Sequence, residues 1–375
     1  MMIRSLRCLC AVLGAAWLAG AAPVMATEYV VPAKGDVGVW FSRLPKDATS
    51  VVFSAADSYH SEGDILLPPR TMLVIDGRGC KLTLGPNSNG FTNAEVADMK
   101  QAMLMATYRY VIKDFADIRG GRKAIDIKSS FGSVMDNLNL SGQTEAAIDL
   151  RFCLLARLRN IRVTHPRNKG IVLRQGDWKG ATGINSQCNS SVLEQCRVYC
   201  HKTTTAAFTI LNSNGVRMTD CVSEGEAADY DLFLSATMDG DESRPASNPV
   251  VKSFMLSGFH VEHQVRKASI YVNMPVKAVV NLENVYWNAP ISEAPVLLYT
   301  MGQVNLTDIG WWNKAFWIGT RINAPRITIA GAPSEMELDG RKVAGNRAGF
   351  MRMVDPLRGN SILQLPYVQV QRKSM

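Results

Sequence analysis

Charged residues at alternate positions of two short apolar segments are the first candidates for chemistry. Asp126 and Lys128 flank one apolar residue, and Asp149 and Arg151 flank another. Arg174 occupies the same place after a third segment. Because side chains alternate between the two faces of a β-strand, these five residues share one outward face. We expect Asp126 to stack on Asp149, and Lys128 to stack on Arg151 and Arg174, with ~4.8 Å between neighbours.

Two reactions suit such a set of residues. In elimination from an acidic sugar, Ca²⁺ or cationic side chains neutralise the sugar carboxylate while a base removes the adjacent proton. Asp126 and Asp149 are the candidates to hold Ca²⁺. Lys128, Arg151 or Arg174 is the candidate base, provided that its neighbours suppress its charge. Hydrolysis instead uses two carboxylates, about 5 Å apart for retention and about 6.5 to 9.5 Å apart for inversion. A purely structural interpretation, cross-strand ion pairs on a solvated face, stays open.

Aromatic residues take over the outward positions further along the chain. They are Phe233, Tyr271, Tyr299 and Trp317. Flat aromatic faces cover the apolar faces of sugar rings, and guanidinium groups pair with carboxylates, so this combination predicts binding of a polyuronate. The alternative is that the C-terminal tail or another subunit covers the column. Trp178 lies in an inserted loop, where it either acts as a lid or subsite residue or folds back onto its own coil.

These residues lie on a short alternating segment that recurs along the chain. The segments are residues 125–127, 148–150, 171–173, 208–210, 232–234, 270–272, 296–298 and 316–318. They begin 23, 23, 37, 24, 38, 26 and 20 residues apart. The two long steps contain the insertions 176–191 and 236–250. Period-2 alternation at such regular spacing predicts a solenoid of strands.

A second pattern follows about twelve residues after most of these segments, where a polar residue or glycine precedes alternating apolar residues. The column contains Asn137, Asn160, Gln195, Asp220, Gly258, Asn284 and Asp308. Asn, Asp and Gly adopt the left-handed conformation most readily, so the column predicts a sharp bend between two strands. Stacked asparagines at this bend would hydrogen-bond from coil to coil. Gln195 is the exception.

This pattern resembles the pectate-lyase-like, or pectin lyase-fold, right-handed parallel β-helix superfamily. Residues 63–68 and 75–79 also look like its opening coils. The resemblance implies an all-β solenoid with three strands per coil, an N-terminal cap and an irregular C-terminal tail. It also implies that sugar chains bind over the first strand, between the inserted loops. The signature motifs of polygalacturonases, pectate lyases and alginate epimerases are absent, so the resemblance does not fix an activity.

The chain divides into four predicted segments. Residues 1–26 have the pattern of a cleaved secretory signal, with two arginines before an apolar run and Val24-Met25-Ala26 at its end. Residues 27–62 form an N-terminal cap with a short helix over 36–44, and residues 63–334 form the β-helix. Residues 335–375 cap the other end or mediate contacts in a homo-oligomer.

The leader predicts a periplasmic or secreted protein. No later stretch is apolar enough to span a membrane. The net charge of +8 falls to about +6 without the leader, which favours acidic partners. The basic residues are dispersed and no nucleic-acid-binding motif occurs, so acidic polysaccharide or a cell-surface glycan is the expected partner.

Two further groups of residues deserve a test. Six cysteines follow the leader: Cys80, Cys153, Cys188, Cys196, Cys200 and Cys221. Cys196 and Cys221 share an inward column, either as stacked thiols or as a disulfide. A second polar cluster contains His165, Tyr199, His201, Glu224, His260, Glu262 and His263, without a recognised metal-ligand spacing.

The sequence therefore predicts an exported β-helix protein that binds an acidic polysaccharide and cleaves it, by elimination rather than by hydrolysis. The alternative is a non-catalytic adhesion, glycan-binding or structural β-helix protein. Whether it is a polysaccharide lyase, a glycoside hydrolase or no enzyme stays open, and Ca²⁺ is the candidate cofactor.

Overall fold

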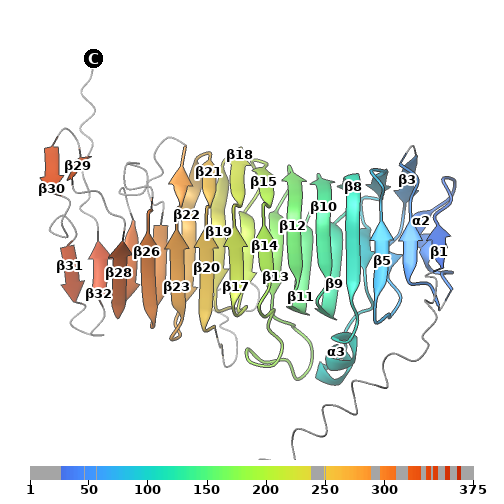
Figure 1. The fold of residues 1–375 in the computed structure, drawn as a ribbon, viewed down its shortest axis with the longest axis horizontal. Coiled ribbons are helices and arrows are strands. Elements are labelled where there is room, and N and C mark those ends of the chain that lie inside the picture. Colours follow the sequence, from blue (N-terminus) through green and yellow to red (C-terminus); the bar gives the residue numbers. More distant parts are fainter. Residues whose placement is uncertain are drawn as a thin grey trace, which may run out of the picture.

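The computed structural model describes residues 27–330 apart from 46, 56, 238–248, 250, 289–295 and 310–319. Beyond residue 330 it describes the backbone of four short strands. The chain winds as a parallel β-helix, an elongated stack of coils with β1 near one end and β29 and β30 near the other (Figure 1).

One strand of each coil belongs to a 12-stranded sheet. Its parallel members are β4 (Ile65–Leu66), β7 (Asn89–Thr92), β9 (Lys123–Phe131), β11 (Ala146–Leu154), β13 (Lys169–Arg174), β16 (Ala206–Leu211), β19 (Ala228–Ser235), β22 (Val265–Met274), β25 (Val296–Thr300) and β27 (Arg321–Ala324). Seven of the eight predicted segments fall within these strands, so the repeat predicted this sheet.

The other strands of the coils form an 18-stranded sheet. Its first ladder contains β1 (Glu28–Val30), β2 (Ser50–Val52), β5 (Leu73–Asp76), β8 (Tyr110–Gly120), β10 (Val134–Ser141), β12 (Arg157–Thr164), β14 (Val192–Glu194), β17 (Val216–Thr219), β20 (Ser253–Ser257), β23 (Val279–Glu283), β26 (Gln303–Thr307) and β28 (Arg326–Ala330). The second ladder adds β3 (Ser58–Ser61), β6 (Lys81–Leu84), β15 (Arg197–Cys200), β18 (Val222–Gly225), β21 (His260–Glu262) and β24 (Tyr286–Trp287). The strands β8, β10 and β12 belong to both ladders and bend between them.

The predicted bend column is confirmed. All seven of its residues, Gln195 included, have φ between 47° and 66°. The preceding coil adds Asp114 with φ 59°. Asn160 donates a side-chain hydrogen bond to Asn137 at 3.0 Å, and Asn137 donates one to Asp114 at 2.7 Å. The asparagine ladder therefore links three coils at the bend.

The core follows the inward columns of the strands. In the 12-stranded sheet Ile125, Ile148, Ile171, Phe208 and Leu232 lie in register and are almost fully buried. Beyond the bend, Cys196 and Cys221 lie in another buried column, and all six cysteines of the described chain are buried free thiols. Of the two interpretations for Cys196 and Cys221, the structure shows stacked thiols.

Two short helices lie outside the coils. α2 (Val37–Phe41) falls within the predicted capping segment, and Asp36 accepts a hydrogen bond from the Val39 amide at its start. α3 (Met99–Met105) was not predicted. It begins after Asp98 in the turn between β7 and β8 and projects from one edge of the solenoid (Figure 1). None of the helices described is long and apolar enough to cross a membrane.

The C-terminal end of the 12-stranded sheet departs from the prediction. Residues 316–318 were expected to stack on residues 296–298, but β27 pairs with β25 there. Arg321 lies beside Leu297, 24 residues earlier, which fits the usual step better than the predicted 20. Beyond β27 the direction changes, because β32 (Ser361–Gln364) pairs antiparallel with β27 and β31 (Met351–Val354) antiparallel with β32. A separate hairpin joins β29 (Glu335–Leu338) and β30 (Arg341–Ala344).

Candidate functional site

The charged columns have the predicted register. Asp126 lies beside Asp149 on the next coil, and Lys128 beside Arg151. Arg151 lies beside Arg174 on the coil after that. The five side chains point away from the apolar core and lie on one face of the 12-stranded sheet. The prediction that the face is exposed is wrong at these coils, however. Asp126 and Lys128 are each 2% exposed, and Asp149 is 4% exposed.

Two chain excursions bury these columns. Residues 93–109, which include α3, cross over β9. The Asn93 side chain donates to the Lys128 carbonyl at 2.8 Å and accepts from its amide at 2.7 Å. The insertion after β13 meets the first excursion, where Met99 donates a backbone hydrogen bond to Lys179 at 3.0 Å. Alternation along a strand reports which way a side chain points, but not whether another part of the chain covers it.

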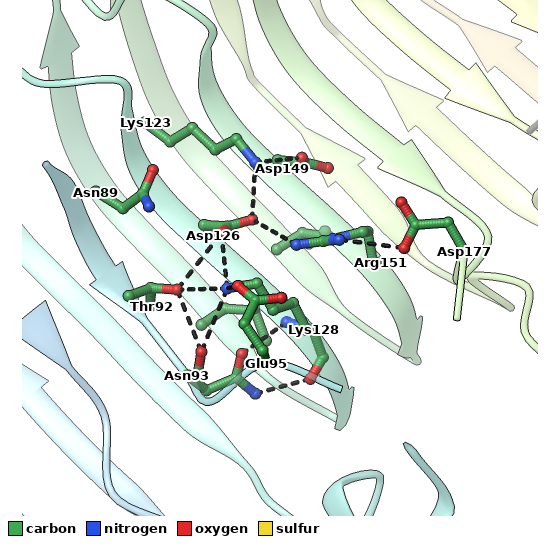
Figure 2. Close-up of polar contacts among 12 residues, drawn as sticks. Asn89, Thr92, Asn93, Glu95, Lys123, Asp126, Lys128, Asp149, Arg151 and Asp177 are labelled. Atoms are coloured by element: carbon green, nitrogen blue, oxygen red, sulfur yellow. Dashed lines mark hydrogen bonds and ion pairs between the residues drawn. The ribbon is translucent and has the colours of Figure 1, made fainter. Parts of the chain in front are cut away.

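Under this cover the charges form a connected group, the buried charge network. It consists of Glu95, Lys123, Asp126, Lys128, Asp149, Arg151, Arg174 and Asp177. Lys123 was not predicted, and its ammonium lies 3.1 Å from Asp126 Oδ1 and 2.8 Å from Asp149 Oδ2 (Figure 2). The Lys128 ammonium lies 2.9 Å from Asp126 Oδ2 and 2.7 Å from Glu95 Oε1 (Figure 2). Four acidic and four basic groups balance each other.

The two arginines complete the network. Arg174 makes a two-point ion pair with Asp149, at 2.9 Å from Nε to Oδ1 and 3.0 Å from Nη2 to Oδ2. Asp177 lies 3.2 Å from Arg151 Nη1 and 3.1 Å from Arg174 Nη1. Burial alone raises the pKa of Asp149, but Arg174 and Lys123 outweigh it and hold that pKa well below its ordinary value. Burial lowers the pKa of Arg174. Asp149 and Asp177 raise this pKa by more than burial lowers it, so the net shift is upward.

These contacts bear on the predicted catalytic roles. A base must give up its proton, and the pKa of Arg174 is shifted in the opposite direction. A Ca²⁺ site needs carboxylate oxygens that are free to coordinate, whereas Asp126 and Asp149 already contact ammonium and guanidinium groups. The arrangement is that of a balanced ionic scaffold, closest to the structural interpretation although buried rather than solvated.

Trp178 belongs to the covering layer. It is 9% exposed and packs against Phe152, Ala102 and Ala106. Its indole nitrogen lies 3.0 Å from the sulfur of Met99 on the other excursion. Of its two predicted roles, the structure shows the one in which Trp178 packs against its own chain.

The aromatic column also has the predicted register. Phe233 lies beside Tyr271, Tyr271 beside Leu297, and Leu297 beside Arg321. The rings of Phe233 and Tyr271 are stacked, with centroids 5.1 Å apart and an interplanar angle of 11°. Trp317 lies outside the described residues.

A parallel outward column runs next to it. Asn273 lies beside Tyr299, and Tyr299 beside Asn323. Between the two columns is an open cavity of about 280 Å³ that we call the Leu297 cavity. It is lined by Tyr271, Val272, Asn273, Leu297, Leu298, Tyr299, Arg321 and Asn323. Leu297 is shorter than the residues on either side of it, Tyr271 and Arg321, which accounts for the hollow. Arg321 and Asn323 were missed because the final strand was placed four residues too early in register.

The second polar cluster divides into two parts. Tyr199, Glu224 and Glu262 lie side by side on successive coils, as predicted for the two glutamates, and His165 packs against Tyr199. Glu224 pairs with Arg197 at 2.6 Å on the outside of the 18-stranded sheet. His263 instead lies inside the solenoid, where its two ring nitrogens face Asp231 and the Glu226 carbonyl. Asp231 also accepts hydrogen bonds from Ser223 at 2.7 Å and Ser269 at 2.5 Å. In the described part of the chain no group of three or more His, Cys, Asp or Glu residues is arranged to hold a metal ion.

Two acceptors face the His263 ring, an arrangement that favours its protonated form. Burial lowers the pKa of His263, but the hydrogen bond and charge of Asp231 outweigh burial, so the pKa is raised. The pair of His263 and Asp231 lies inside the coils that carry Phe233 and Tyr271 on their outer face. Asp231 belongs to β19, as Phe233 does, and Ser269, which also contacts Asp231, belongs to β22, as Tyr271 does.

Comparisons with known proteins add fold neighbours. No family model matches the chain, and no curated protein matches its sequence. Among solved structures, PfbA, a surface adhesin of Streptococcus pneumoniae, is 9% identical with a TM-score of 0.42, covering 90% of this chain and 100% of that one. The catalytic domain of a GH87 alpha-1,3-glucanase in complex with nigerose is 12% identical with a TM-score of 0.38, covering 83% and 69%.

Proposed function

We propose that the protein binds an acidic polysaccharide over the outward face of the 12-stranded sheet, with one sugar unit in the Leu297 cavity. The observation that carries this proposal is the lining of the cavity, which combines tyrosine rings, amide side chains and a guanidinium around an apolar floor. Saccharide sites need apolar contact for the ring faces and polar groups that fix orientation.

The aromatic wall is rigid on one side. Phe233 stacks on one face of the Tyr271 ring. The neighbour on the following coil is Leu297, whose side chain is smaller and lies at the floor of the cavity. A sugar ring above Leu297 would contact Tyr271 and Tyr299 without displacing a packed aromatic residue. The stacked pair therefore supports a preformed surface, which lowers the entropy cost of binding.

Arg321 favours a carboxylated sugar. It is exposed and has no ion pair with any residue that the structure describes. A guanidinium makes two parallel hydrogen bonds to a carboxylate. Asn323 is adjacent, and its side-chain oxygen is buried without a hydrogen-bond partner among the described residues. That oxygen is suited to accept a hydrogen bond from a sugar hydroxyl, because a buried polar atom without a partner is costly.

If cleavage follows binding, elimination fits this cavity better than hydrolysis. Hydrolysis needs two carboxylates, and none lines the cavity in the described part of the chain. In elimination, Arg321 would neutralise the sugar carboxylate while the phenol oxygen of Tyr271 or Tyr299 takes the proton from the adjacent carbon and gives its own proton to the leaving sugar oxygen. The bond to the leaving sugar oxygen then breaks, a C=C bond forms in the ring, and the leaving oxygen takes up a proton.

The alternative is glycan binding without catalysis, as in an adhesion protein. The buried charge network favours it, because the acidic groups that sequence reasoning placed in a catalytic site are engaged in ion pairs. Both versions place the protein in the periplasm or outside the cell, on the evidence of the leader-like residues 1–26.

Calorimetric titration with polyuronates and with uncharged glucans tests the proposal. Binding of the polyuronate should be lost on Tyr271→Ala and weakened at least tenfold on Arg321→Ala, but unchanged on Arg217→Ala, an exposed arginine of the 18-stranded sheet. Absorbance of unsaturated products would identify elimination, and binding without products the adhesion version. Equal affinity of wild type and both cavity variants would refute the site.

A further inference from the structure

Exposed apolar side chains gather on one edge of the solenoid, formed by the turns that follow the strands of the 12-stranded sheet. Seven of the eleven exposed large apolar side chains in the described part of the chain lie in these turns. They are Met72, Met103, Leu104, Phe131, Leu155, Ile184 and Met301, each 44 to 63% exposed. This edge is more apolar than the rest of the surface, and such patches mark interaction sites.

The first six of these residues form a row over five successive coils. Backbone hydrogen bonds connect each turn to the next, from Leu73 to Arg109 at 3.0 Å, from Phe131 to Tyr108 at 2.9 Å and from Gly132 to Leu154 at 2.8 Å. With ~4.8 Å between coils, the row is roughly 20 Å long. α3 and the insertion after β13 project furthest from this edge (Figure 1). They carry Met103, Leu104 and Ile184 at positions 56 to 63% exposed.

The edge also carries cations without an ion-pair partner among the described residues. Lys100, Arg109 and Lys179 are exposed on it and have no ion pair with described residues. Its three acidic residues, Glu95, Asp98 and Asp177, each have a partner, although the side chain of Glu95 is 81% exposed and that of Asp177 is 42% exposed. Glu95 pairs with Lys128, and Asp177 pairs with Arg151 and Arg174 in the buried charge network. Asp98 caps α3 by accepting a hydrogen bond from the Gln101 amide. The network therefore leaves the cations of this edge without partners.

We propose that this edge docks the protein on an anionic phospholipid surface. Met103, Leu104 and Ile184 would enter the interface between headgroups and acyl chains, and Lys100, Arg109 and Lys179 would contact the headgroups. A bilayer is favoured over a protein partner because the apolar residues lie on projecting turns and are interspersed with cations that have no ion pair with described residues. The axis of the solenoid then lies parallel to the membrane, and the Leu297 cavity faces sideways, accessible to a polysaccharide.

Vesicle flotation tests this proposal with the protein purified in the form that an expressing host exports. Vesicles of phosphatidylglycerol and phosphatidylcholine in equal parts are compared with vesicles of phosphatidylcholine alone. The edge variant is Leu104→Ser/Phe131→Ser/Ile184→Ser. The matched control is Val30→Ser/Val39→Ser/Tyr199→Ser, which removes three exposed apolar side chains from other faces. A charge variant is Lys100→Glu/Lys179→Glu.

Wild type and control should float with the anionic vesicles and bind the neutral ones more weakly. The edge variant and the charge variant should each lower the coefficient for partition of the protein into anionic vesicles by about tenfold or more. Absence of wild-type binding, or an equal loss in the control, would overturn the proposal. So would light scattering that shows a dimer abolished by the edge variant, which would make the edge an interface between copies. Polysaccharide binding is measured separately, so the two proposals can fail independently.

Discussion

Asp149 and Arg174 form a two-point ion pair across neighbouring coils, with both carboxylate oxygens within 3.0 Å of guanidinium nitrogens. The pair faces away from the apolar core, yet Asp149 is almost fully buried. The column in which the sequence placed catalytic candidates thus contains a buried ion pair beneath two chain excursions.

Asp149→Ala should therefore destabilise the fold rather than only abolish activity. The substitution removes one of the two carboxylates that neutralise each of Lys123 and Arg174 and so leaves an excess of buried positive charge, which costs about 3 to 5 kcal/mol of unfolding free energy. Urea unfolding measures the loss. The control is Asp136→Ala, which removes an ion pair to the largely exposed Arg159 and should cost less than about 1 kcal/mol. Equal unfolding midpoints for the two variants would contradict the buried network.

Calcium should have no effect on stability. The ammonium of Lys123 contacts both Asp126 and Asp149. Lys128 also contacts Asp126, and Arg174 also contacts Asp149, so both carboxylates are neutralised. A divalent cation would have to displace these tethered cations before it could coordinate. Thermal unfolding with added Ca²⁺ and with a chelator should give the same midpoint. A midpoint that rises with Ca²⁺ and no longer does so in Asp126→Asn would restore the predicted metal site.

Stability should fall as the pH rises through the folded pKa of His263. Because Asp231 raises that pKa above the ordinary value of about 6.5, the ion pair contributes fully below this value and is lost at higher pH. The unfolding free energy of wild type minus that of His263→Gln should be larger at about pH 6 than at about pH 9. Glu224 also favours the charged ring, so Glu224→Gln serves as a second comparison. A difference that does not change with pH would show that the imidazole is neutral in the fold.

The bend column allows a test of backbone conformation. Asn137 has φ 53° and takes part in two ladder hydrogen bonds. Asn137→Gly loses the ladder but keeps easy access to this φ, whereas Asn137→Ala loses both. The Ala variant should be less stable than the Gly variant by roughly 1 to 2 kcal/mol in chemical unfolding. The opposite order would show that the left-handed conformation does not explain the asparagine, since both variants lose the ladder.

Periodicity in the sequence predicted most of the fold. Inward residues such as Ile148 and Phe208 recur at coil spacing, and bend residues such as Asn160 occupy a fixed place after them, because every coil repeats the same geometry. The last strand was misplaced since Phe316-Trp317-Ile318 alternates as well as Arg321–Ala324 does, and spacing alone separates the two.

The candidate site could be predicted only in part. The columns through Asp126 and Tyr271 follow from strand register, which is a local property. Their burial depends on α3 and on the insertion after β13, whose contacts join residues such as Met99 and Lys179 that are far apart in sequence. No alternation pattern records such a contact, so the exposed cavity near Tyr299 and the covered network could not be told apart.

The antiparallel pairing of β32 with β27 has a consequence for behaviour at high concentration. A parallel β-helix that ended at β27 would present unpaired amides and carbonyls to any further strand and could template end-to-end fibres. In this chain the reversed strand occupies that edge, and the new edge strand, β31, is only four residues long. The reversed strand thus removes the parallel template from this end of the 12-stranded sheet.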